Sequence, residues 1–479
     1  MDTKKLRQKI LDLAIRGKLV PQDPNDEPAS VLLERIRAEK EQLIKEGKIK
    51  RSKKSESSDK PHYENYELPS GWKYDLITNI CSKIVDGDHN PPVAQKQISP
   101  YIMLSSKNIN EDAITNLNDV RYLSKADFDI SNNRTKVTKG DVLFTSVGSI
   151  GRTCIYDLVV PVAFQRSVTV MTTYIYNRYF KLFLDSPLYQ NYVFENARGT
   201  AQKGFYINQI ENSLIPIPPY NEQIKIVEIT EKLLFFVKKI EEERNNIIEN
   251  IYRIKSEILD LAISGKLVPQ NSADEPAIEL LRKINPAFKP CDNSHYENMV
   301  IPESWEMVSM NNIVDIISGV SFTKMDIKKC GIRILRGGNI QDGEIVCLDD
   351  DVYVDVSYSN NINSIIEGDI VLVASTGSST LIGKTGYART TYQNTQIGAF
   401  LRIIRPKSIN ISAYLNLIFN SNYYKNYIRS LAKGTNINNV KNGYIEQFMV
   451  ALPPIQEQNR IVSMVNNIFT TLNIITAEL

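Results

Sequence analysis

Two short motifs in the sequence resemble parts of known catalytic sites, but neither is complete. Asn90-Pro91-Pro92-Val93 has the order of the Asn-Pro-Pro-aromatic box with which adenine methyltransferases hold a flipped amino group, yet valine stands where the stacking ring belongs. The stretch from Gly377 to Thr385 resembles a phosphate-binding P-loop but has one residue too many between its glycines. Asp349–Asp351 fits no metal-dependent nuclease pattern and is better interpreted as a turn. The sequence therefore gives no case for catalysis by this chain.

The composition excludes several further classes of protein. The 479 residues are 42% hydrophobic and 23% charged, which is enough for about three globular units at roughly 150 residues each. The net charge is only +2, so the charge balance neither indicates nor excludes a nucleic-acid partner. Five cysteines without a Cys-x-x-Cys pair, and three histidines, predict no disulfide scaffold and no metal site. No apolar stretch is long enough to span a membrane and no signal peptide is recognisable, so we expect a cytoplasmic protein.

The chain contains an internal repeat. Residues 10–36 and 258–284 are identical at 19 of 27 positions at a constant offset of 248. Shorter matches follow in the same order: Trp72 recurs as Trp305, and a Pro-Pro-x-x-Glu-Gln box ends each half. The segments between the matches have diverged almost completely. Shared ends with different middles indicate a two-fold binding device with two different ligands; duplication of a structural domain without function is the alternative.

A long heptad pattern follows each Pro-Pro-x-x-Glu-Gln box. From Ile226 to Leu261 the seam positions recur at spacings of four and three, and only Thr230 and Arg244 are not apolar. A period of about 3.5 residues is typical of a coiled coil. The second copy has the same period from Ile461 to Leu479, where the sequence ends.

The N-terminus matches the part that the second copy lacks. In repeat alignment, residues 457–479 and 1–16 tile one helix of the central type with a gap of only four residues. We therefore expect a circularly permuted repeat, with pseudo-two-fold symmetry, whose termini lie together and complete a second long helix.

Between the helices we expect two domains of the α/β (mixed α+β) class. Short β-branched and aromatic runs alternate with turns, and each domain has one late amphipathic helix, near 178–197 and near 413–432. The predicted parts are a first piece of the distal helix (1–20), a linker (21–61), a first domain (62–219), a central spacer helix (220–264), a second linker (265–294), a second domain (295–454) and the last piece of the distal helix (455–479).

This set of motifs resembles the DNA specificity subunit of Type I restriction–modification systems. The resemblance rests on the two Pro-Pro-x-x-Glu-Gln boxes with their heptad helices, on ILDLAI-x-GKLVPQ in both repeats, and on domains that open with ELPSGW and IPESW. It implies two tandem target-recognition domains separated by two long antiparallel coiled-coil helices, each domain binding one half of a bipartite double-stranded DNA site.

The resemblance also implies partners. Two modification subunits, using S-adenosylmethionine, would dock on the helices, and restriction subunits, using ATP and Mg, would join them; this chain itself would hold no cofactor and no metal. The helix residues expected to serve docking are Leu6, Ile10, Leu13, Leu233, Val237, Ile240, Ile251, Ile254, Ile258, Ile468, Leu472 and Ile475. A stand-alone DNA adenine methyltransferase and a coiled-coil adaptor without DNA specificity remain the alternatives.

Base recognition needs amide and cationic side chains on a rigid domain, with phosphate contacts fixing the register. For any single residue an exposed loop position without function is the competing interpretation. The candidates in the first domain are His89, Asn90, Lys107, Asn108, Arg152, Gln165, Arg166, Thr200, Gln202 and Lys203. Those in the second are Arg336, Asn339, Lys384, Arg389, Gln396, Lys433, Thr435, Asn436 and Asn438.

Overall fold

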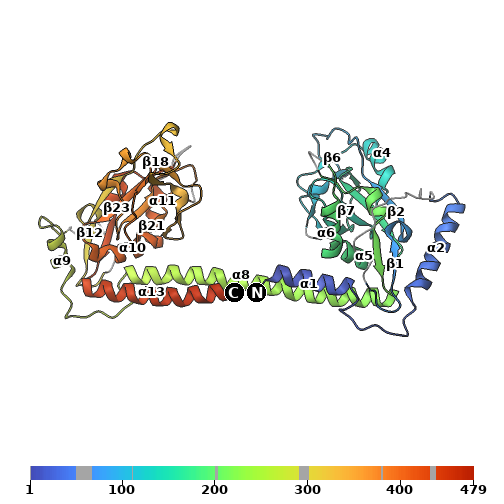
Figure 1. The fold of residues 1–479 in the computed structure, drawn as a ribbon, viewed down its shortest axis with the longest axis horizontal. Helices are drawn as coiled ribbons and strands as arrows, with labels where there is room; N and C mark the ends of the chain where they lie inside the picture. The colour runs from blue at the N-terminus through green and yellow to red at the C-terminus, as the bar shows by residue number, and fades with distance from the viewer. Residues whose placement is uncertain are drawn as a thin grey trace. The chain divides into compact units, whose positions relative to one another are not determined.

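A computed structural model of the chain describes residues 2–49, 67–110, 112–199, 203–290, 301–378, 381–431 and 438–479. The chain divides into two compact units, Met1–Glu243 and Arg244–Leu479, and the division falls inside the longest helix, α8 (Tyr220–Ile263). Each unit consists of a mixed helix and strand domain and a piece of this helix (Figure 1). The mixed fold class predicted from the sequence is confirmed.

Unit 1 contains a four-stranded antiparallel sheet of order β2-β10-β7-β8 and a three-stranded sheet of order β6-β3-β9 in which β3 and β9 are parallel. Two small pairs, β1-β11 and β4-β5, complete it. The strands are β1 (Lys73–Leu76), β2 (Cys81–Asp86), β3 (Ile102–Leu104), β4 (Ile109–Asn110), β5 (Ala113–Ile114), β6 (Arg121–Tyr122), β7 (Val142–Thr145), β8 (Thr153–Ile155), β9 (Val162–Phe164), β10 (Val168–Thr173) and β11 (Leu214–Ile217). The helices before α8 are α1 (Thr3–Ile15), α2 (Ala29–Lys45), α3 (Ile77–Ile80), α4 (Lys125–Thr135), α5 (Asn177–Asp185), α6 (Pro187–Asn196) and α7 (Ile207–Glu211).

Unit 2 repeats this plan with longer sheets. Its strands have the orders β13-β23-β19-β21-β17-β16, β14-β18-β15-β22, β12-β25 and β20-β24, and β15 is parallel to β22 as β3 is to β9. The strands are β12 (Glu306–Ser309), β13 (Val314–Ser318), β14 (Ile327–Lys328), β15 (Ile332–Leu335), β16 (Ile340–Gln341), β17 (Glu344–Ile345), β18 (Val352–Val354), β19 (Ile370–Val373), β20 (Ser375–Thr376), β21 (Thr385–Tyr387), β22 (Thr395–Ile397), β23 (Leu401–Pro406), β24 (Asn438–Asn439) and β25 (Met449–Leu452). The helices after α8 are α9 (Ala277–Ile284), α10 (Ser412–Asn420), α11 (Asn422–Leu431), α12 (Asn442–Glu446) and α13 (Ile455–Glu478).

Each predicted late helix is in fact two helices. Ser186 ends α5, and its hydroxyl accepts the Tyr189 N–H at 3.3 Å to start α6, whose first residue is Pro187. Because proline at the first helical position fits a new helix and cannot continue an old one, the break falls there. The break between α10 and α11 falls at Ser421, whose hydroxyl accepts the Tyr424 N–H at 3.4 Å.

The two predicted linkers are wrong in part. Residues 21–61 contain α2, which buries Leu32, Leu33 and Ile36 in the core of unit 1, and 265–294 contain α9, which buries Leu281 in the core of unit 2. Short amphipathic helices of this kind gain stability from packing rather than from their own propensity. Both helices therefore belong to the domains.

Within each unit, α8 lies beside a shorter antiparallel helix (Figure 1). In unit 1, Thr3 at the start of α1 bonds to Glu241, while Ile15 at its end packs in the same core as Ile226. In unit 2, Lys255 donates to Asn473 of α13 at 2.5 Å. Antiparallel helix pairing is thus confirmed inside each unit. The expectation that the two termini complete one helix concerns the placement of the units and stays a prediction.

Candidate DNA interface and its junction with the helices

The repeated sequence motifs meet at one buried hydrogen-bond network in each unit. In unit 1 the Trp72 indole N–H donates to Oε2 of Glu222 at 3.0 Å, and the Gln22 amide donates to Oε1 of the same carboxyl at 3.1 Å. Glu222 is the glutamate of the Pro-Pro-x-x-Glu-Gln box at the start of α8, and only 1% of it is exposed. The three residues, here called the junction triad, therefore fix the base of the long helix to the domain.

Unit 2 has the same triad. Trp305 donates to Oε2 of Glu457 at 2.9 Å, and Gln270 donates to Oε1 at 2.6 Å. Burial raises the pKa of Glu457, and of Glu222 in unit 1, above the ordinary glutamate value. These motifs are visible in the sequence as repeats, but no role for their side chains follows from the sequence. Their identity in two repeats separated by diverged sequence was the signal that they share one structural task.

A glycine makes each triad possible. Gly17 has φ +65°, and a Cβ there would lie 2.4 Å from Cγ of Pro69 and 3.1 Å from the Trp72 ring. Gly265 has φ +69° and the same relation to Pro302 and Trp305. Only glycine combines a left-handed backbone with this close approach.

A second repeated feature is a group of loops, which we call the loop rim. In unit 1 it consists of residues 105–108 after β3, 146–152 after β7, 165–167 after β9, and 203–205. Because β3 and β9 are parallel, their carboxyl ends and the loops that follow meet at one edge. Ser146 N–H donates to the Ser167 carbonyl at 2.9 Å, and Phe205 N–H donates to the Ser146 carbonyl at 2.8 Å. Backbone bonds thus hold three of the loops together.

The rim of unit 2 has the same bonds with different residues. It consists of 336–339, 374–378 with 381–384, 398–400 and 438–440. Ala374 N–H donates to the Phe400 carbonyl at 2.9 Å, and Val440 N–H donates to the Ala374 carbonyl at 2.7 Å. The scaffold of the rim is therefore shared, whereas its side chains differ.

Several of the candidate base-reading residues lie on the rim. Arg152 and Lys384 occupy the same position, directly after a positive-φ glycine and directly before strand β8 or β21. Both are exposed. Within the described residues, Lys384, Arg166 and Lys203 form no side-chain hydrogen bond or ion pair, whereas Arg152 donates to Asn110. Cationic groups on this surface suit contact with phosphates or guanine edges.

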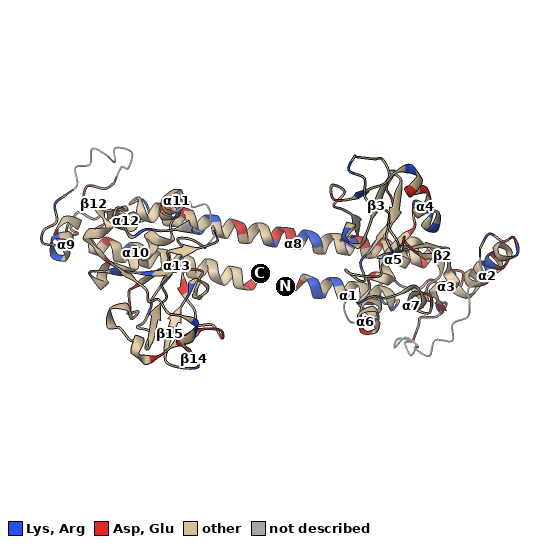
Figure 2. Cartoon of the chain, turned by 90° about the horizontal axis from the view of Figure 1, so that it is seen from above, with Lys and Arg blue, Asp and Glu red and all other residues tan. Residues whose placement is uncertain are grey.

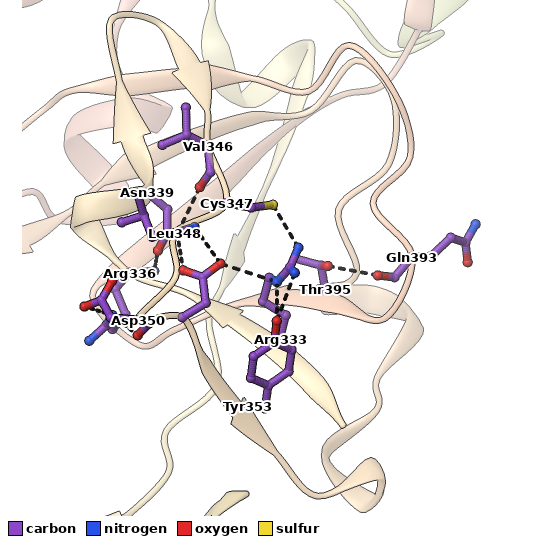
Figure 3. A network of polar contacts seen from close by, with 11 residues as sticks. Arg333, Arg336, Asn339, Val346, Cys347, Leu348, Asp350, Tyr353, Gln393 and Thr395 are labelled. Carbon is purple, nitrogen blue, oxygen red and sulfur yellow. Dashed lines mark hydrogen bonds and ion pairs between the residues drawn. The ribbon is translucent and has the colours of Figure 1, made fainter. Parts of the chain in front are cut away.

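Two predicted amides are structural instead. Asn108 and Asn339 are fully buried, and the side-chain oxygen of each accepts a backbone N–H three residues earlier, at 3.0 Å from Ser105 and 2.8 Å from Arg336. The Asn339 amide also donates to the Val346 carbonyl (Figure 3) and to the Asp351 carboxylate. Each amide holds its loop closed, so we withdraw both from the base-reading set.

Two further candidates, Gln396 and Arg389, lie outside the loop rim. Gln396 is 1% exposed in β22 and donates to the Asn360 carbonyl at 3.2 Å. Arg389 follows β21 at the end of the β19–β21 hairpin opposite to Lys384, where it forms an ion pair with Glu344 at 2.6 Å. Burial takes Gln396 out of an exposed position, whereas exposed Arg389 lies outside the loop rim and its assignment stays a prediction.

The remaining candidates adjoin the rim or have partners there. His89 lies 3.4 Å from Asp86 and 3.4 Å from Arg134, and exposed Asn90 follows it in a loop whose Asp88 pairs with Gln165. Lys107 forms an ion pair with Asp119 at 2.7 Å, and Arg336 forms one with Asp350 at 3.0 Å (Figure 3). Gln165 is half-buried. Outside the described residues lie Thr200, Gln202, Lys433, Thr435, Asn436 and the side chain of Asn438.

An acidic residue that sequence analysis assigned to a turn organises the rim of unit 2. Asp351 is buried and accepts from Asn339 at 2.6 Å and from Leu348 N–H at 3.0 Å. Arg333 approaches it at 3.4 Å and donates to the Tyr353 hydroxyl at 2.9 Å (Figure 3). Asp351 is thus a loop-holding carboxylate, in agreement with the turn interpretation, and no group of three metal ligands occurs among the described residues.

Comparison with known proteins identifies the family. A family model described as the Type I restriction modification DNA specificity domain matches residues 95–250 and 302–479, more than half of the chain. The chain belongs to this family. The Type I restriction enzyme EcoAI specificity subunit of Escherichia coli is 28% identical over 553 residues, covering 98% of this chain and 89% of that protein. The EcoEI specificity subunit of Escherichia coli is 32% identical over 340 residues, covering 59% of this chain and 54% of that protein.

A solved structure shares the fold. A chain from work described as the structural basis underlying complex assembly and conformational transition of the type I R-M system superposes with a TM-score of 0.54 at 16% identity, covering 86% of this chain and 94% of that one. The resemblance seen in the sequence is confirmed. The chain is a specificity subunit, the non-catalytic DNA-recognition component that acts with methyltransferase and restriction subunits, and the comparisons support neither alternative.

The long helices of the specificity subunit combine buried seam positions with exposed apolar ones. Exposed aromatic rings also occur on α8, where Phe235 is 61% and Phe236 49% exposed. Charges of both signs alternate along α8 (Figure 2). None of its described helices is long and apolar enough to cross a membrane. Of the predicted docking residues, Ile10, Val237, Ile251 and Ile258 are buried, Leu6, Leu13, Leu233, Ile468 and Leu472 are half-buried, and Ile240, Ile254 and Ile475 are exposed.

Proposed function

We propose that the loop rim of each unit binds one half of a bipartite double-stranded DNA target. The observation that carries the proposal is the repeated rim: the same backbone bonds, between Ser146 and Ser167 in unit 1 and between Ala374 and Phe400 in unit 2, support different exposed side chains. A shared scaffold with different side chains is what two different half-sites require. Arg152 and Lys384, at one position of the two rims, are the first candidates for DNA contact.

We propose further that the helices dock two modification subunits, one on α8 with α1 and one on α8 with α13. The exposed apolar residues of α8, including Phe235, Phe236 and Ile254, supply the kind of area that partner binding buries. The modification subunits would use S-adenosylmethionine, and restriction subunits would use ATP and Mg; the assembly would act on DNA in the cytoplasm.

The experiment is co-expression with a methyltransferase subunit of the same system, followed by genome-wide mapping of methylated adenines. We expect one motif with two specified halves separated by unspecified base pairs. Replacing residues 62–219 by the matching region of a relative should change one half only. Lys40 of α2 donates to the backbone carbonyls of Thr78 and Cys81 at 2.5 and 2.8 Å, but Arg37 of α2 forms an ion pair with Asp75 at 2.9 Å, so the donor region should keep an acidic residue at the position of Asp75. A change in both halves, or in neither, would contradict independent recognition by the two domains.

Single substitutions separate the two rims. Arg152→Ala should weaken binding through one half-site and Lys384→Ala through the other, by about ten-fold or more if each contacts a base and less if each contacts only a phosphate. Exposed Lys139 lies before β7, at the end of that strand opposite to the rim, so Lys139→Ala is the matched control and should leave binding unchanged. Equal losses for all three variants would indicate a nonspecific charge effect instead.

A further inference from the structure

The rim of unit 2 displays an exposed aromatic side chain. Phe400 lies in the short loop between β22 and β23, and 68% of it is exposed. Its neighbours on the rim are polar or small, among them exposed Lys384 and half-buried Ser375 and Thr376. A phenylalanine in this position gains little from folding, since most of its surface remains in water. Exposure alone does not mark a site, because Val159 and Met325 are more exposed still; Phe400 is distinguished by its place on the rim.

The turn that carries Phe400 is fixed. Its carbonyl accepts the N–H groups of Ala374 and Ser375 at 2.9 and 3.1 Å, and Leu401 N–H donates to the Gly398 carbonyl at 2.9 Å. The Arg402 guanidinium donates to the carbonyls of Ala399 and Leu401 at 2.8 and 2.7 Å. Asn442 accepts from Arg402 Nε at 3.1 Å, which holds the guanidinium in turn. The backbone under the ring is thus preorganised, which lowers the entropy cost of binding.

The same position in unit 1 has different chemistry. Ser167 there accepts the backbone bond that Phe400 accepts in unit 2, and its hydroxyl accepts the Ser106 N–H at 3.1 Å. Its side chain is therefore part of the loop structure, whereas the Phe400 ring points out of it. The two half-sites should differ at the base pair that faces this position.

We propose that Phe400 contacts the C5-methyl group of a thymine in the half-site bound by unit 2. This inference rests on the proposed function and assigns one residue of the rim to one chemical group of the target. The thymine methyl is the one apolar group on the major-groove edge of a base pair, and apolar side chains recognise it. The other apolar surface of DNA, the face of a base pair, is reached only by unstacking, which costs a few kcal/mol. Contact with the methyl group needs no such deformation.

The test uses the unaltered protein in complex with its methyltransferase subunit. Each thymine of the unit 2 half-site is replaced in turn by uracil, which lacks only the methyl group, and binding is measured. We expect one position at which uracil weakens binding about fourfold, the effect of losing one buried methyl-sized group. In the unit 1 half-site, Ser167 takes the position of Phe400. Replacing the thymine at the matching position by uracil should therefore have no effect that depends on Phe400.

Variants of Phe400 then assign the contact. Phe400→Ala should bind thymine and uracil at that position equally, whereas Phe400→Leu should keep part of the preference. Because the ring is exposed, neither variant should lower the melting temperature appreciably, and melting is measured as the control for folding. The inference is overturned if no thymine of that half-site is sensitive to uracil, or if Phe400→Ala keeps the full preference. Binding without any sequence preference would overturn the proposed function as well, so the two failures are distinguishable.

Discussion

The indole nitrogen of Trp72 and the carboxylate of Glu222 lie 150 residues apart in the sequence and 3.0 Å apart in the structure, where both side chains are buried. One belongs to the opening of the variable domain and the other to the start of α8. Their hydrogen bond therefore fixes the domain of unit 1 to the start of α8. The hydrogen bond between Trp305 and Glu457 fixes the domain of unit 2 to the start of α13 in the same way.

The buried carboxyls of Glu222 and Glu457 should make stability depend on pH. Burial raises the pKa of both above the ordinary value. The native state therefore holds protons that the unfolded state has released, and stability falls as pH rises from about 4.3 through the raised pKa. In Glu222→Gln/Glu457→Gln this loss should disappear, so the stability of the double variant relative to the native chain should increase between about pH 4 and pH 7.

Thermal unfolding of both proteins across that pH range checks the prediction. Each glutamine has one oxygen for two donors, so the variant loses about 1 kcal/mol per site at every pH. That loss shifts the free energy of unfolding of the variant by the same amount at every pH. The prediction therefore concerns only how the difference in stability between the two proteins changes with pH. Parallel stability curves would show that these carboxyls do not titrate differently in the folded and unfolded states.

Gly17 should be far less tolerant of substitution than Gly47, although both have positive φ. At Gly17, φ is +65° and a Cβ would lie 2.4 Å from Pro69; at Gly47, φ is +70° and no atom lies within 4 Å. Gly47→Ala should cost about 1 kcal/mol, the left-handed backbone strain alone. Gly17→Ala should cost the same strain plus the clash with a ring that cannot rotate away, about 3 kcal/mol in total. Urea unfolding of the two variants makes the comparison; equal costs would mean that the junction yields to an added methyl group.

Removal of α1 should reduce the number of docked modification subunits. Deletion of residues 1–13 removes buried Ile10 and half-buried Leu6 and Leu13, and each large aliphatic side chain is worth roughly 1.5–3 kcal/mol when buried. We expect native mass spectrometry to show one modification subunit in place of two. The control is Lys4→Ala, an exposed change in the same helix. A complex that still holds two copies after the deletion would exclude α1 from the docking surface.

The length of α8 should set the distance between half-sites. Insertion of one heptad between Ile247 and Ile254 keeps the apolar phase and adds about 10.5 Å of helix. At about 3.4 Å per base pair this allows at most roughly three additional unspecified base pairs, and one to three is the expected shift. Methylome mapping measures the gap directly. If methylation persists at the normal level with the gap unchanged, α8 is not the spacer.

The sequence predicted those parts of the fold that repeat or have a strong period. The heptad period predicted α8, and the short β-branched and aromatic runs predicted domains that contain strands, among them β7 and β19. The second predicted linker contains α9, which at 8 residues is shorter than the window of roughly 11 to 18 residues over which a helical period is recognised. Its stability comes from tertiary packing of Leu281, which local sequence does not display.

The rim could be predicted only as a set of polar residues. Asn108 and Lys107 are neighbours with equally suitable side chains, yet the first is buried in a loop and the second is exposed. The local sequence does not distinguish an amide that is bonded to the backbone of its own loop from one that is free to form hydrogen bonds with the edge of a base. Phe400 was overlooked for the opposite reason, since an apolar residue after a strand is ordinarily assigned to the core.

The backbone bonds between Ser146 and Ser167, and between Ala374 and Phe400, do not involve side chains. Substitution of an exposed rim side chain such as that of Arg166 or Lys384 therefore leaves these bonds in place, whereas the Ser167 hydroxyl, which accepts the Ser106 N–H, belongs to the scaffold. Under the proposed function, one unit can therefore acquire a new half-site preference through its exposed rim side chains while the other unit keeps its own.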